Sequence, residues 1–353
     1  MEISITKTNK PKQKPDENNL GFGKIFTDHM FLMNYTTEKG WHDPRIVPYA
    51  PIEFSLATMT FHYGQSIFEG LKAYRTQDGD VQLFRPKNNM ARLNNSAKRL
   101  CIPTIDEDFA VDAIKKLVDV DRDWVPSNPG TSLYIRPFIF GTDEFLGVHP
   151  SDSYIFAIIC SPSGSYYPEG INPVKIYVED KYVRAVKGGV GFAKTEANYA
   201  VSLKAQDEAE QKGYSQVLWL DGKTGEYIEE VGAMNVFFVI DGEVITPSAE
   251  GSILEGITRL STIELLRAKG YKVTERQLKI AELTEAYDAG KLDEAFGTGT
   301  AAVISPMGEL CYKGKNMIIN NNEIGKISQL VYDQLTGIQY GELPDEFNWV
   351  QKV

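Results

Sequence analysis

The sequence is poor in the residues that mark several special classes of protein. Its three cysteines (Cys101, Cys160 and Cys311) are far apart and form no CxxC pair, and its four histidines show no metal-ligand spacing. No apolar run approaches the roughly 18 residues that cross a bilayer, and the first 19 residues lack the apolar segment of a signal peptide. These absences argue against a disulfide framework, a zinc motif and a membrane-spanning helix. They favour a protein of the reducing cytoplasm.

Positive charge is also scarce. Lys and Arg number 37 against 48 Asp and Glu, which gives a net charge of −11. A chain this acidic repels a phosphate backbone, and no run of basic and aromatic residues compensates for it. The short lysine-rich stretch at 7–14 is predicted to be a solvated tail. We therefore expect no nucleic-acid partner.

The chain does contain enough apolar material for two domains. It has 353 residues, of which 42% are hydrophobic and 24% are charged, a composition typical of globular proteins. Residues 1–20 are polar and are predicted to be disordered or loosely attached. A Ser-, Gly- and Pro-rich segment at 164–173 is the predicted linker between a domain at 21–163 and a second domain at 174–353. A groove between two such domains is the default ligand site.

Hydrophobic periodicity predicts mixed strands and helices in both domains. Strands are expected at 81–84, 132–140, 154–160, 174–178 and 216–220, with a hairpin formed by 235–240 and 243–245 across Asp241-Gly242. Helices are expected from Pro86 to just before Pro103 and at 109–120, 196–212, 257–268 and 324–335.

A glycine-rich string at 297–302 (GTGTAA) resembles part of the dinucleotide-binding fingerprint and follows a short predicted strand. That fingerprint also requires an acidic residue about 20 positions on, and residues 313–322 contain none. We interpret the string as a turn of small residues where the backbone comes close to a ligand, without a dinucleotide. A nicotinamide-linked oxidoreductase is accordingly a distant alternative.

Lys194 stands between a glycine-rich segment and a predicted helix, in the string KGGVGFAKTEANY (187–199). A single lysine usually faces solvent, and that is the ordinary interpretation. The flanking Gly, Ala and Phe residues indicate packed surroundings instead, where a lysine is unfavourable unless it is neutralised or used covalently. Lys194 is therefore a candidate catalytic residue.

The KTEANY string (194–199) resembles the lysine motif of fold-type IV pyridoxal-phosphate enzymes, specifically the eukaryotic-like branch of the branched-chain amino acid aminotransferases. Further segments resemble this family in the same order along the chain: FGKIFTDHMF (22–31), FHYGQSIFEGLKAYR (61–75), FRPKNNMARLNNSAKRL (84–100), SLYIRPFIFGT (132–142), KYVRAVKGG (181–189), QVLWLDG (216–222), EEVGAMNVF (229–237), SILEGITR (252–259), FGTGTAA (296–302) and IQYG (338–341). They span nearly the whole chain after residue 20. The resemblance implies a mixed α/β fold with a small open α/β domain and a larger pseudo-barrel domain, and a homodimer.

In this family the cofactor is pyridoxal 5′-phosphate, and the resemblance assigns roles around it. Lys194 would bind the cofactor covalently and then move the proton at the substrate Cα. Glu230 would pair with the pyridine nitrogen, and Tyr199 would hydrogen-bond the phenolic oxygen. The phosphate side would comprise Arg92, the backbone N–H groups of Ile257 and Thr258, the Thr300 hydroxyl and, as a further cofactor-side position, Arg184. No metal is expected.

The resemblance also implies a substrate pocket for leucine, isoleucine and valine that must admit glutamate as well. Its aromatic positions would be Phe22, Tyr63, Phe68, Tyr134 and Tyr166, each of which is otherwise an ordinary core residue. The backbone N–H groups of Ala301 and Ala302, together with the Tyr63 hydroxyl, would hold the α-carboxylate. Arg136 would receive the γ-carboxylate of glutamate.

Two departures from the family pattern carry expectations of their own. Vertebrate relatives have a CxxC thiol pair where this chain has Ala302 and Ser305, so no redox switch is expected there. A hydroxyl residue is common where Ala233 stands, so one hydrogen bond near the cofactor or substrate is expected to be missing.

The expected activity is the reversible, ping-pong transfer of the amino group of L-leucine, L-isoleucine or L-valine to 2-oxoglutarate. Two other activities of the same fold are alternatives, a D-amino acid aminotransferase and an aminodeoxychorismate lyase. A small-molecule binding protein without turnover is a third. A pure binder has no need for a cofactor lysine paired with an acid that faces a pyridine ring, which argues against it.

Overall fold

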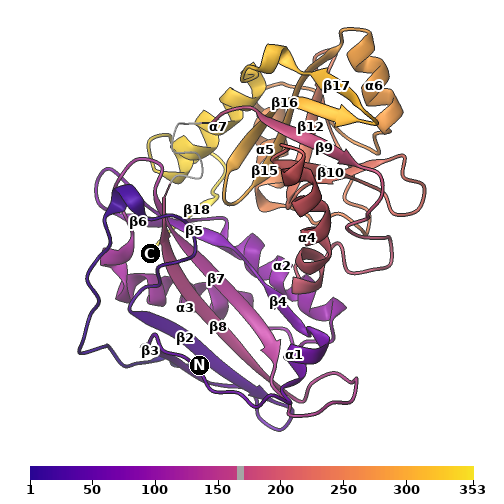
Figure 1. Cartoon of the computed structure of the whole chain (residues 1–353). Helices are drawn as coiled ribbons and strands as arrows, with labels where there is room; N and C mark the ends of the chain where they lie inside the picture. Colours follow the sequence, from indigo (N-terminus) through magenta and orange to yellow (C-terminus); the bar gives the residue numbers. More distant parts are fainter. Residues whose placement is uncertain (165–170) are drawn as a thin grey trace. The chain divides into compact units, whose positions relative to one another are not determined.

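The chain divides into two compact units in the computed structural model, which describes residues 1–164 and 171–353. Unit 1 comprises Met1–Tyr166, Ala193–Glu196 and Gly337–Val353, and unit 2 comprises Tyr167–Phe192 and Ala197–Thr336. Figure 1 follows the chain through both by colour. Two short segments that sequence analysis assigned to the second domain, Lys194 with its neighbours and the C-terminal 17 residues from Gly337 to Val353, thus belong to unit 1.

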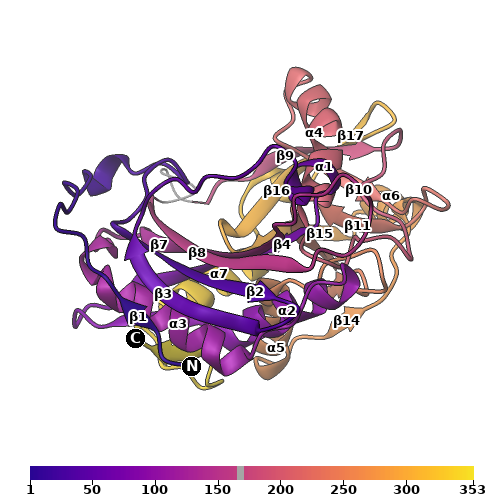
Figure 2. The ribbon, with the colours of Figure 1, turned by 90° about the horizontal axis from the view of Figure 1, so that it is seen from below.

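Unit 1 is built on a nine-stranded sheet with the order β1-β3-β2-β8-β7-β5-β6-β18, and β4 pairs with β7. The strands are β1 (Ser4–Ile5), β2 (His29–Thr36), β3 (Gly40–Pro48), β4 (Ser66–Phe68), β5 (Leu71–Arg75), β6 (Val81–Phe84), β7 (Ser132–Gly141), β8 (Ser153–Ser163) and β18 (Val350–Lys352). The helices are α1 (Met59–Tyr63), α2 (Pro86–Arg99) and α3 (Glu107–Val120). Figure 2 shows α2 and α3 along one side of this sheet.

Strand β7 shows how the sequence assigns the two faces of this sheet. Side chains alternate along a strand, and Leu133, Ile135 and Ile139 enter the core that α2 and α3 share with the sheet. The alternate residues Tyr134, Arg136 and Phe138 are half-buried on the opposite face. Alternation in the string SLYIRPFIF thus places a tyrosine and an arginine side by side, away from the core.

The N-terminal segment differs from the prediction that it is loosely attached. Strand β1 pairs in parallel with β3, and the Lys12 ammonium donates to the carbonyl groups of Phe26 (3.1 Å) and Thr27 (2.8 Å). The Glu17 carboxylate accepts hydrogen bonds from the backbone N–H groups of 127 and 128. Polar composition misled the prediction because hydrogen bonds to backbone groups, together with the isolated buried side chains of Ile3 and Leu20, hold the segment in place.

Unit 2 contains a closed ring of six strands, which is the pseudo-barrel that the resemblance implies. Its members pair in the order β11-β10-β9-β16-β15-β12, and β12 pairs with β11 to close the ring. The ring strands are β9 (Val174–Glu179), β10 (Gln216–Leu220), β11 (Ile228–Val231), β12 (Met234–Ile240), β15 (Leu292–Gly299) and β16 (Val303–Tyr312). The predicted mixed α/β fold is confirmed.

Further strands and helices of unit 2 surround this ring. Strands β13 (Glu243–Thr246), β14 (Val273–Glu275) and β17 (Lys315–Ile318) extend the sheet, and the helices are α4 (Glu196–Gln211), α5 (Ile257–Ala268), α6 (Ile280–Asp288) and α7 (Lys326–Gln339). Helix α4 begins directly after the Lys194 segment. Among the described residues, none of the helices combines the length and the apolar character needed to span a bilayer.

Candidate active site

Lys194 is fixed by its backbone to unit 1. Its N–H donates to the Ser96 hydroxyl on α2 (2.9 Å), and its carbonyl accepts from the N–H of Phe68 at the end of β4 (3.0 Å). The next residue, Thr195, donates its hydroxyl to the carbonyl of Ser66 (2.8 Å). The lysine amine lies over the Phe68 ring, 4.7 Å from its centroid. A catalytic lysine needs this kind of anchorage, because only the side chain is then left to move.

Four of the predicted pocket residues come together in unit 1, next to Lys194. The Arg136 guanidinium stacks on the Phe68 ring with its carbon 4.5 Å from the centroid, and Nη2 donates to the Tyr134 hydroxyl (2.9 Å). Phe22 meets the Tyr134 ring edge to face at 4.9 Å between centroids. The arrangement is an aromatic surface that carries one guanidinium and one phenol, which suits a ligand with both an apolar and an acidic end.

The other predicted aromatic positions are placed differently. Tyr63 lies at the end of α1 with 41% of its surface exposed, and its hydroxyl donates to the carbonyl of Leu146 on the loop between β7 and β8. Binding of an α-carboxylate by this hydroxyl would therefore have to replace that bond. Tyr166 lies outside the described residues.

Arg92 on α2 is held by an acid that sequence analysis did not single out. The Glu69 carboxylate is fully buried and accepts Arg92 Nε and Nη2 at 2.8 Å each, as a bidentate pair. It also accepts the Asn89 side-chain amide (2.8 Å) and the N–H of Gly70 (3.3 Å). Such a fork fixes the plane of the guanidinium. The missed signal was an acidic residue inside the apolar string IFEGLKAY (67–74).

In unit 2, the predicted acid and the cofactor-side arginine form a buried ion pair. Glu230 on β11 is 4% exposed, and its carboxylate contacts the Arg184 guanidinium. Arg184 also donates to the carbonyl groups of Ser252 (2.7 Å) and Gly191 (3.3 Å). A buried carboxylate with a cationic neighbour stays ionised more readily than one without.

These two residues line a pocket within unit 2 that also contains the predicted Tyr199. The pocket is lined by Arg184, Asn198, Tyr199, Ser202, Glu230, Gly232, Ala233 and Leu254. Ala233 is one of the departures noted from the family pattern, and its small side chain lies on the wall of this pocket. The pocket presents a phenol, a carboxylate and a guanidinium, which are groups that can orient a polar ligand by hydrogen bonds and charge.

A second buried carboxyl, Glu229, directly precedes Glu230. It accepts a hydrogen bond from the Ser252 hydroxyl through Oε1, whereas Oε2 has no hydrogen-bond partner in the described part of the chain. Burial raises the pKa of Glu229, and the Ser252 hydrogen bond and the charge of Arg184 offset this only in part. The two neighbouring acids therefore have different environments.

Asn235 connects Glu230 to the start of α5. Its side-chain amide donates to Glu230 Oε1 (3.2 Å) and to the carbonyl of Leu254 (2.8 Å). A Cβ on Gly256, the residue before the helix, would overlap Asn235 Oδ1 and lie 3.3 Å from its Cγ. The helix begins at Ile257 and Thr258 without a side-chain cap, so its first backbone N–H groups are the kind that bind an anion.

The glycine-rich string at 297–302 runs from the end of β15 into the turn that leads to β16. This is a strand-to-strand turn, and a dinucleotide fingerprint requires a strand-to-helix turn. A Cβ on Gly297 or Gly299 would lie 3.0 Å from side-chain carbons of Met234. The predicted close approach is therefore to a protein side chain at these two glycines. Thr300, Ala301 and Ala302 form the turn itself.

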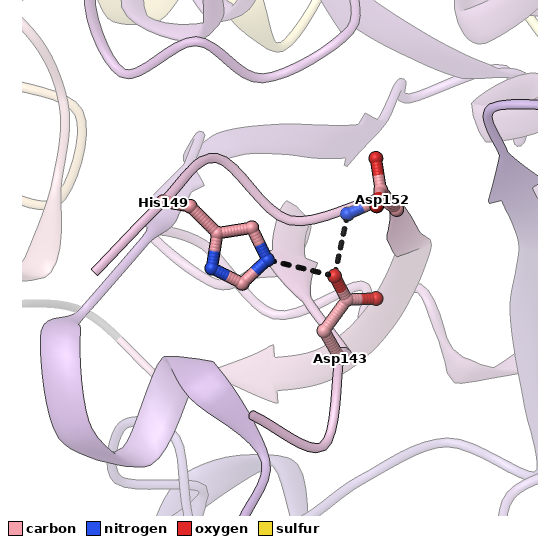
Figure 3. A group of neighbouring side chains, drawn as sticks. All are labelled: Asp143, His149 and Asp152. Carbon is pink, nitrogen blue, oxygen red and sulfur yellow. Dashed lines mark hydrogen bonds and ion pairs between the residues drawn. The ribbon is translucent and has the colours of Figure 1, made fainter. Parts of the chain in front are cut away.

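Asp143, His149 and Asp152 form a group with metal-ligand side chains in the loop between β7 and β8 (Figure 3). The Asp143 carboxylate accepts the Ser153 hydroxyl (2.6 Å) and the N–H of Asp152 (2.7 Å), and it faces His149 Nε2 at 3.5 Å. Burial alone would raise the pKa of Asp143, but these hydrogen bonds outweigh it and hold the pKa below its usual value. These contacts join the two ends of the loop between β7 and β8, so the group is explained by a structural role.

Comparison with known proteins matches residues 66–310 to the family described as "Amino-transferase class IV". Branched-chain-amino-acid aminotransferase 2 of Bacillus subtilis (strain 168) is 58% identical over 353 residues, 100% of this chain and 97% of that protein. The crystal structure of Escherichia coli branched-chain amino acid aminotransferase has a TM-score of 0.77 at 28% identity, covering 92% of this chain and 98% of that chain. The branched-chain amino acid aminotransferase from Thermobaculum terrenum in its PLP-form has a TM-score of 0.75 at 26% identity, covering 92% of this chain and 98% of that chain.

Proposed function

This chain belongs to the class IV aminotransferase family, and from that premise we propose that it transfers the amino group of L-leucine, L-isoleucine or L-valine reversibly to 2-oxoglutarate. The observation that carries the proposal is the backbone anchorage of Lys194 beside Phe68, Arg136 and Tyr134. The similarity to relatives with branched-chain substrates in their names supports the substrate class.

The residues present fit pyridoxal 5′-phosphate as the cofactor. A buried carboxylate with two donors, Glu230, suits a protonated ring nitrogen, and Tyr199 in the same pocket suits the phenolic oxygen. The uncapped start of α5 suits a phosphate, as does the guanidinium of Arg92. We expect Arg184, Ile257, Thr258 and Thr300 to complete the set. When bound, pyridoxal phosphate supplies a conjugated ring that accepts the electron pair left on the substrate Cα.

The protein groups then have distinct tasks. The Lys194 amine takes the proton from the substrate Cα, and its fixed backbone keeps the amine in reach of that atom. Glu230 would pair with the ring nitrogen of the bound cofactor, and its negative charge would favour the protonated form of that nitrogen. The backbone N–H groups of Ala301 and Ala302 orient the α-carboxylate. Phe22 and Phe68 exclude water from the apolar end of the substrate.

Two substrate classes share the pocket in this proposal. An aromatic surface accepts leucine, isoleucine and valine but discriminates among them by only about 1–3 kcal/mol per methyl group. Arg136 receives the γ-carboxylate of glutamate and 2-oxoglutarate, and the apolar substrates leave its guanidinium stacked on Phe68. The homodimer and the cytoplasmic location expected from the sequence stay predictions, the first to be tested by light scattering of the purified protein.

The decisive experiment is visible absorbance of the purified protein before and after addition of L-leucine, with Lys194→Ala as the control variant. We expect a yellow protein whose band L-leucine bleaches and 2-oxoglutarate restores, and a Lys194→Ala variant that does neither. Bleaching by D-alanine alone would instead assign the D-amino acid activity. A protein that stays colourless after incubation with pyridoxal phosphate would refute the catalytic proposal and favour a binding protein.

A further inference from the structure

Three consecutive residues, the last of β4 and the two that connect it to β5, each contact a different functional group of unit 1. Phe68 lies under the Lys194 amine and the Arg136 guanidinium. Glu69 holds Arg92. Gly70 packs against the end of Tyr134. Phe68 was predicted from the sequence to be a pocket residue. Gly70 was not, and its role depends on its lack of a side chain.

Gly70 is a glycine because of the space around it. A Cβ at this position would overlap the Tyr134 hydroxyl oxygen and lie 3.0 Å from Cζ and 3.4 Å from Cε2 of the same ring. The backbone of Gly70 is outside the positive-φ region that favours glycine, so any residue could adopt its conformation. Within the described part of the chain, the atoms nearest to such a side chain all belong to the phenol of Tyr134.

The backbone of Gly70 cannot easily move to make room. Its N–H donates to Glu69 Oε2 (3.3 Å), and its carbonyl accepts the Asn89 amide (3.3 Å). Glu69 itself is fixed by the bidentate pair with Arg92. A methyl group at position 70 must therefore displace the Tyr134 ring rather than the chain.

Displacement of Tyr134 moves Arg136 as well. The Tyr134 hydroxyl accepts Arg136 Nη2 at 2.9 Å, and Arg136 Nε is buried with no hydrogen-bond partner among the described residues. The guanidinium is otherwise positioned by stacking on the rings of Phe68 and Tyr134. Among the described residues, the phenol thus supplies a hydrogen bond that directs the guanidinium, and the Glu196 carboxylate attracts it electrostatically.

We propose that Gly70 is a specificity-determining residue: the absence of a side chain lets the Tyr134 hydroxyl rest against the backbone, where it aims Arg136 at the acidic substrate. This inference rests on the proposed function, because it assigns the γ-carboxylate of glutamate and 2-oxoglutarate to Arg136. Apolar substrates do not use that guanidinium. A side chain at position 70 should therefore weaken binding of acidic ligands selectively.

The test compares Gly70→Ala, Tyr134→Phe and the double variant as holoenzymes. Binding of glutarate and of 4-methylvalerate, which carry no reacting group, reports the acidic and apolar ends separately by titration calorimetry. We expect Gly70→Ala to weaken glutarate at least tenfold and 4-methylvalerate less than threefold. Tyr134→Phe removes the overlapping oxygen, so adding Gly70→Ala to it should weaken glutarate less than twofold further.

Gly141→Ala is the matched control, because Gly141 is a buried glycine on the same strand as Tyr134 and a Cβ there would lie 2.9 Å from the Ser151 Cβ. It should lower the melting temperature without changing the ratio of the two affinities. The proposal would be overturned if Gly70→Ala weakened the binding of both ligands equally, or if it weakened glutarate binding as much in the Tyr134→Phe background as in the wild type. Neither result would contradict the proposed function, provided that the wild type turns over leucine. A wild type that binds neither ligand and does not turn over leucine would refute the proposed function and this inference with it.

Discussion

The buried pair of Glu69 and Arg92 gives the sharpest prediction about stability. Glu69 is fully buried and receives three hydrogen bonds of 2.8 Å, two from Arg92 and one from Asn89. Glu69→Gln keeps the volume but turns one carboxylate oxygen into a donor that faces other donors. It also removes the carboxylate charge that pairs with the buried guanidinium of Arg92.

Removing one partner of a buried ion pair costs about 3–5 kcal/mol. For a domain of about 150–250 residues, each kcal/mol lowers the melting temperature by about 2–4 °C. We therefore expect Glu69→Gln to lower the melting temperature of the cofactor-free protein by roughly 6–20 °C. Calorimetry on the cofactor-free protein measures this without any contribution from ligand binding. Because Arg92 is no longer oriented, pyridoxal phosphate should also be lost faster on dialysis.

The control is a solvent-exposed ion pair between α2, the helix that carries Arg92, and α3. Lys87 Nζ and Asp108 Oδ1 are 2.7 Å apart, but both side chains are mostly exposed. Exposed pairs contribute little because water screens them, so Asp108→Asn should leave the melting temperature unchanged within error. If Glu69→Gln lowers the melting temperature no more than Asp108→Asn does, the argument from burial is wrong.

Three further predictions concern unit 2. Asn235→Ala removes two hydrogen bonds that connect Glu230 to the loop before α5. Each is worth about 1 kcal/mol, so the affinity for pyridoxal phosphate should fall by roughly tenfold or more. An unchanged dissociation constant from absorbance titration would contradict this. Glu229→Gln should change cofactor affinity and melting temperature less than Glu230→Gln does, since burial raises the pKa of Glu229 and makes its charged form less favourable, and Glu230→Gln, measured alongside, should lose cofactor. For Asp221, burial alone would raise the pKa, but hydrogen bonds from the N–H groups of Tyr227, Thr224 and Glu226 outweigh it and lower the pKa to about 2. Because the pKa of Asp221 is lower in the folded than in the unfolded protein, its contribution to stability is complete above about pH 4 and is lost as the pH falls toward 2. The difference in melting temperature between wild type and Asp221→Asn should therefore shrink as the pH is lowered over that range. A constant difference would refute the assignment.

Elements with strong local signals were predicted well from the sequence. Helix α5 spans Ile257–Ala268, as its apolar spacing and the following Lys-Gly pair indicate. The hairpin between β12 and β13 turns at Asp241 and Gly242, which both have positive φ (52° and 76°), as the two-residue hairpin turn requires. In both cases the information lies within a few residues of the element itself.

Elements that depend on distant partners were missed. Strands β2 and β3 carry polar residues, and β3 also carries prolines. Strand β2 lies beside β8, where Phe31 pairs with Ile158. Strand β16 contains Pro306 and Gly308 and was missed, whereas the short strand expected at 294–296 covers only part of β15; both are strands because the closed ring gives them neighbours on both sides. Local propensity carries no information about such pairings, since partners distant in the sequence supply the hydrogen bonds.

In the candidate site, too, some residues were predicted from the sequence, and those that act through distant partners were missed. The aromatic and basic residues expected around the lysine do gather there: Phe22, Phe68, Tyr134 and Arg136 lie together in unit 1. The residues that orient them were not foreseen, because each acts through a partner elsewhere in the sequence. Glu69 acts on Arg92, 23 positions on. Gly70 acts on Tyr134, which only the register of β5 against β7 brings near it.

The two adjacent acids Glu229 and Glu230 differ in their surroundings, which the structure shows and the sequence motif does not. Two adjacent acids in a strand point to opposite sides, and both are buried here because β11 belongs to a closed ring. Glu230 receives Arg184 and the Asn235 amide, whereas Glu229 receives a single hydroxyl and leaves one oxygen without a partner in the described chain. A carboxylate that must hold a positive ring nitrogen has to remain charged, and the donors that stabilise a charge surround the second acid rather than the first. The choice of Glu230, which the resemblance alone suggested, thus acquires a physical reason that is independent of it.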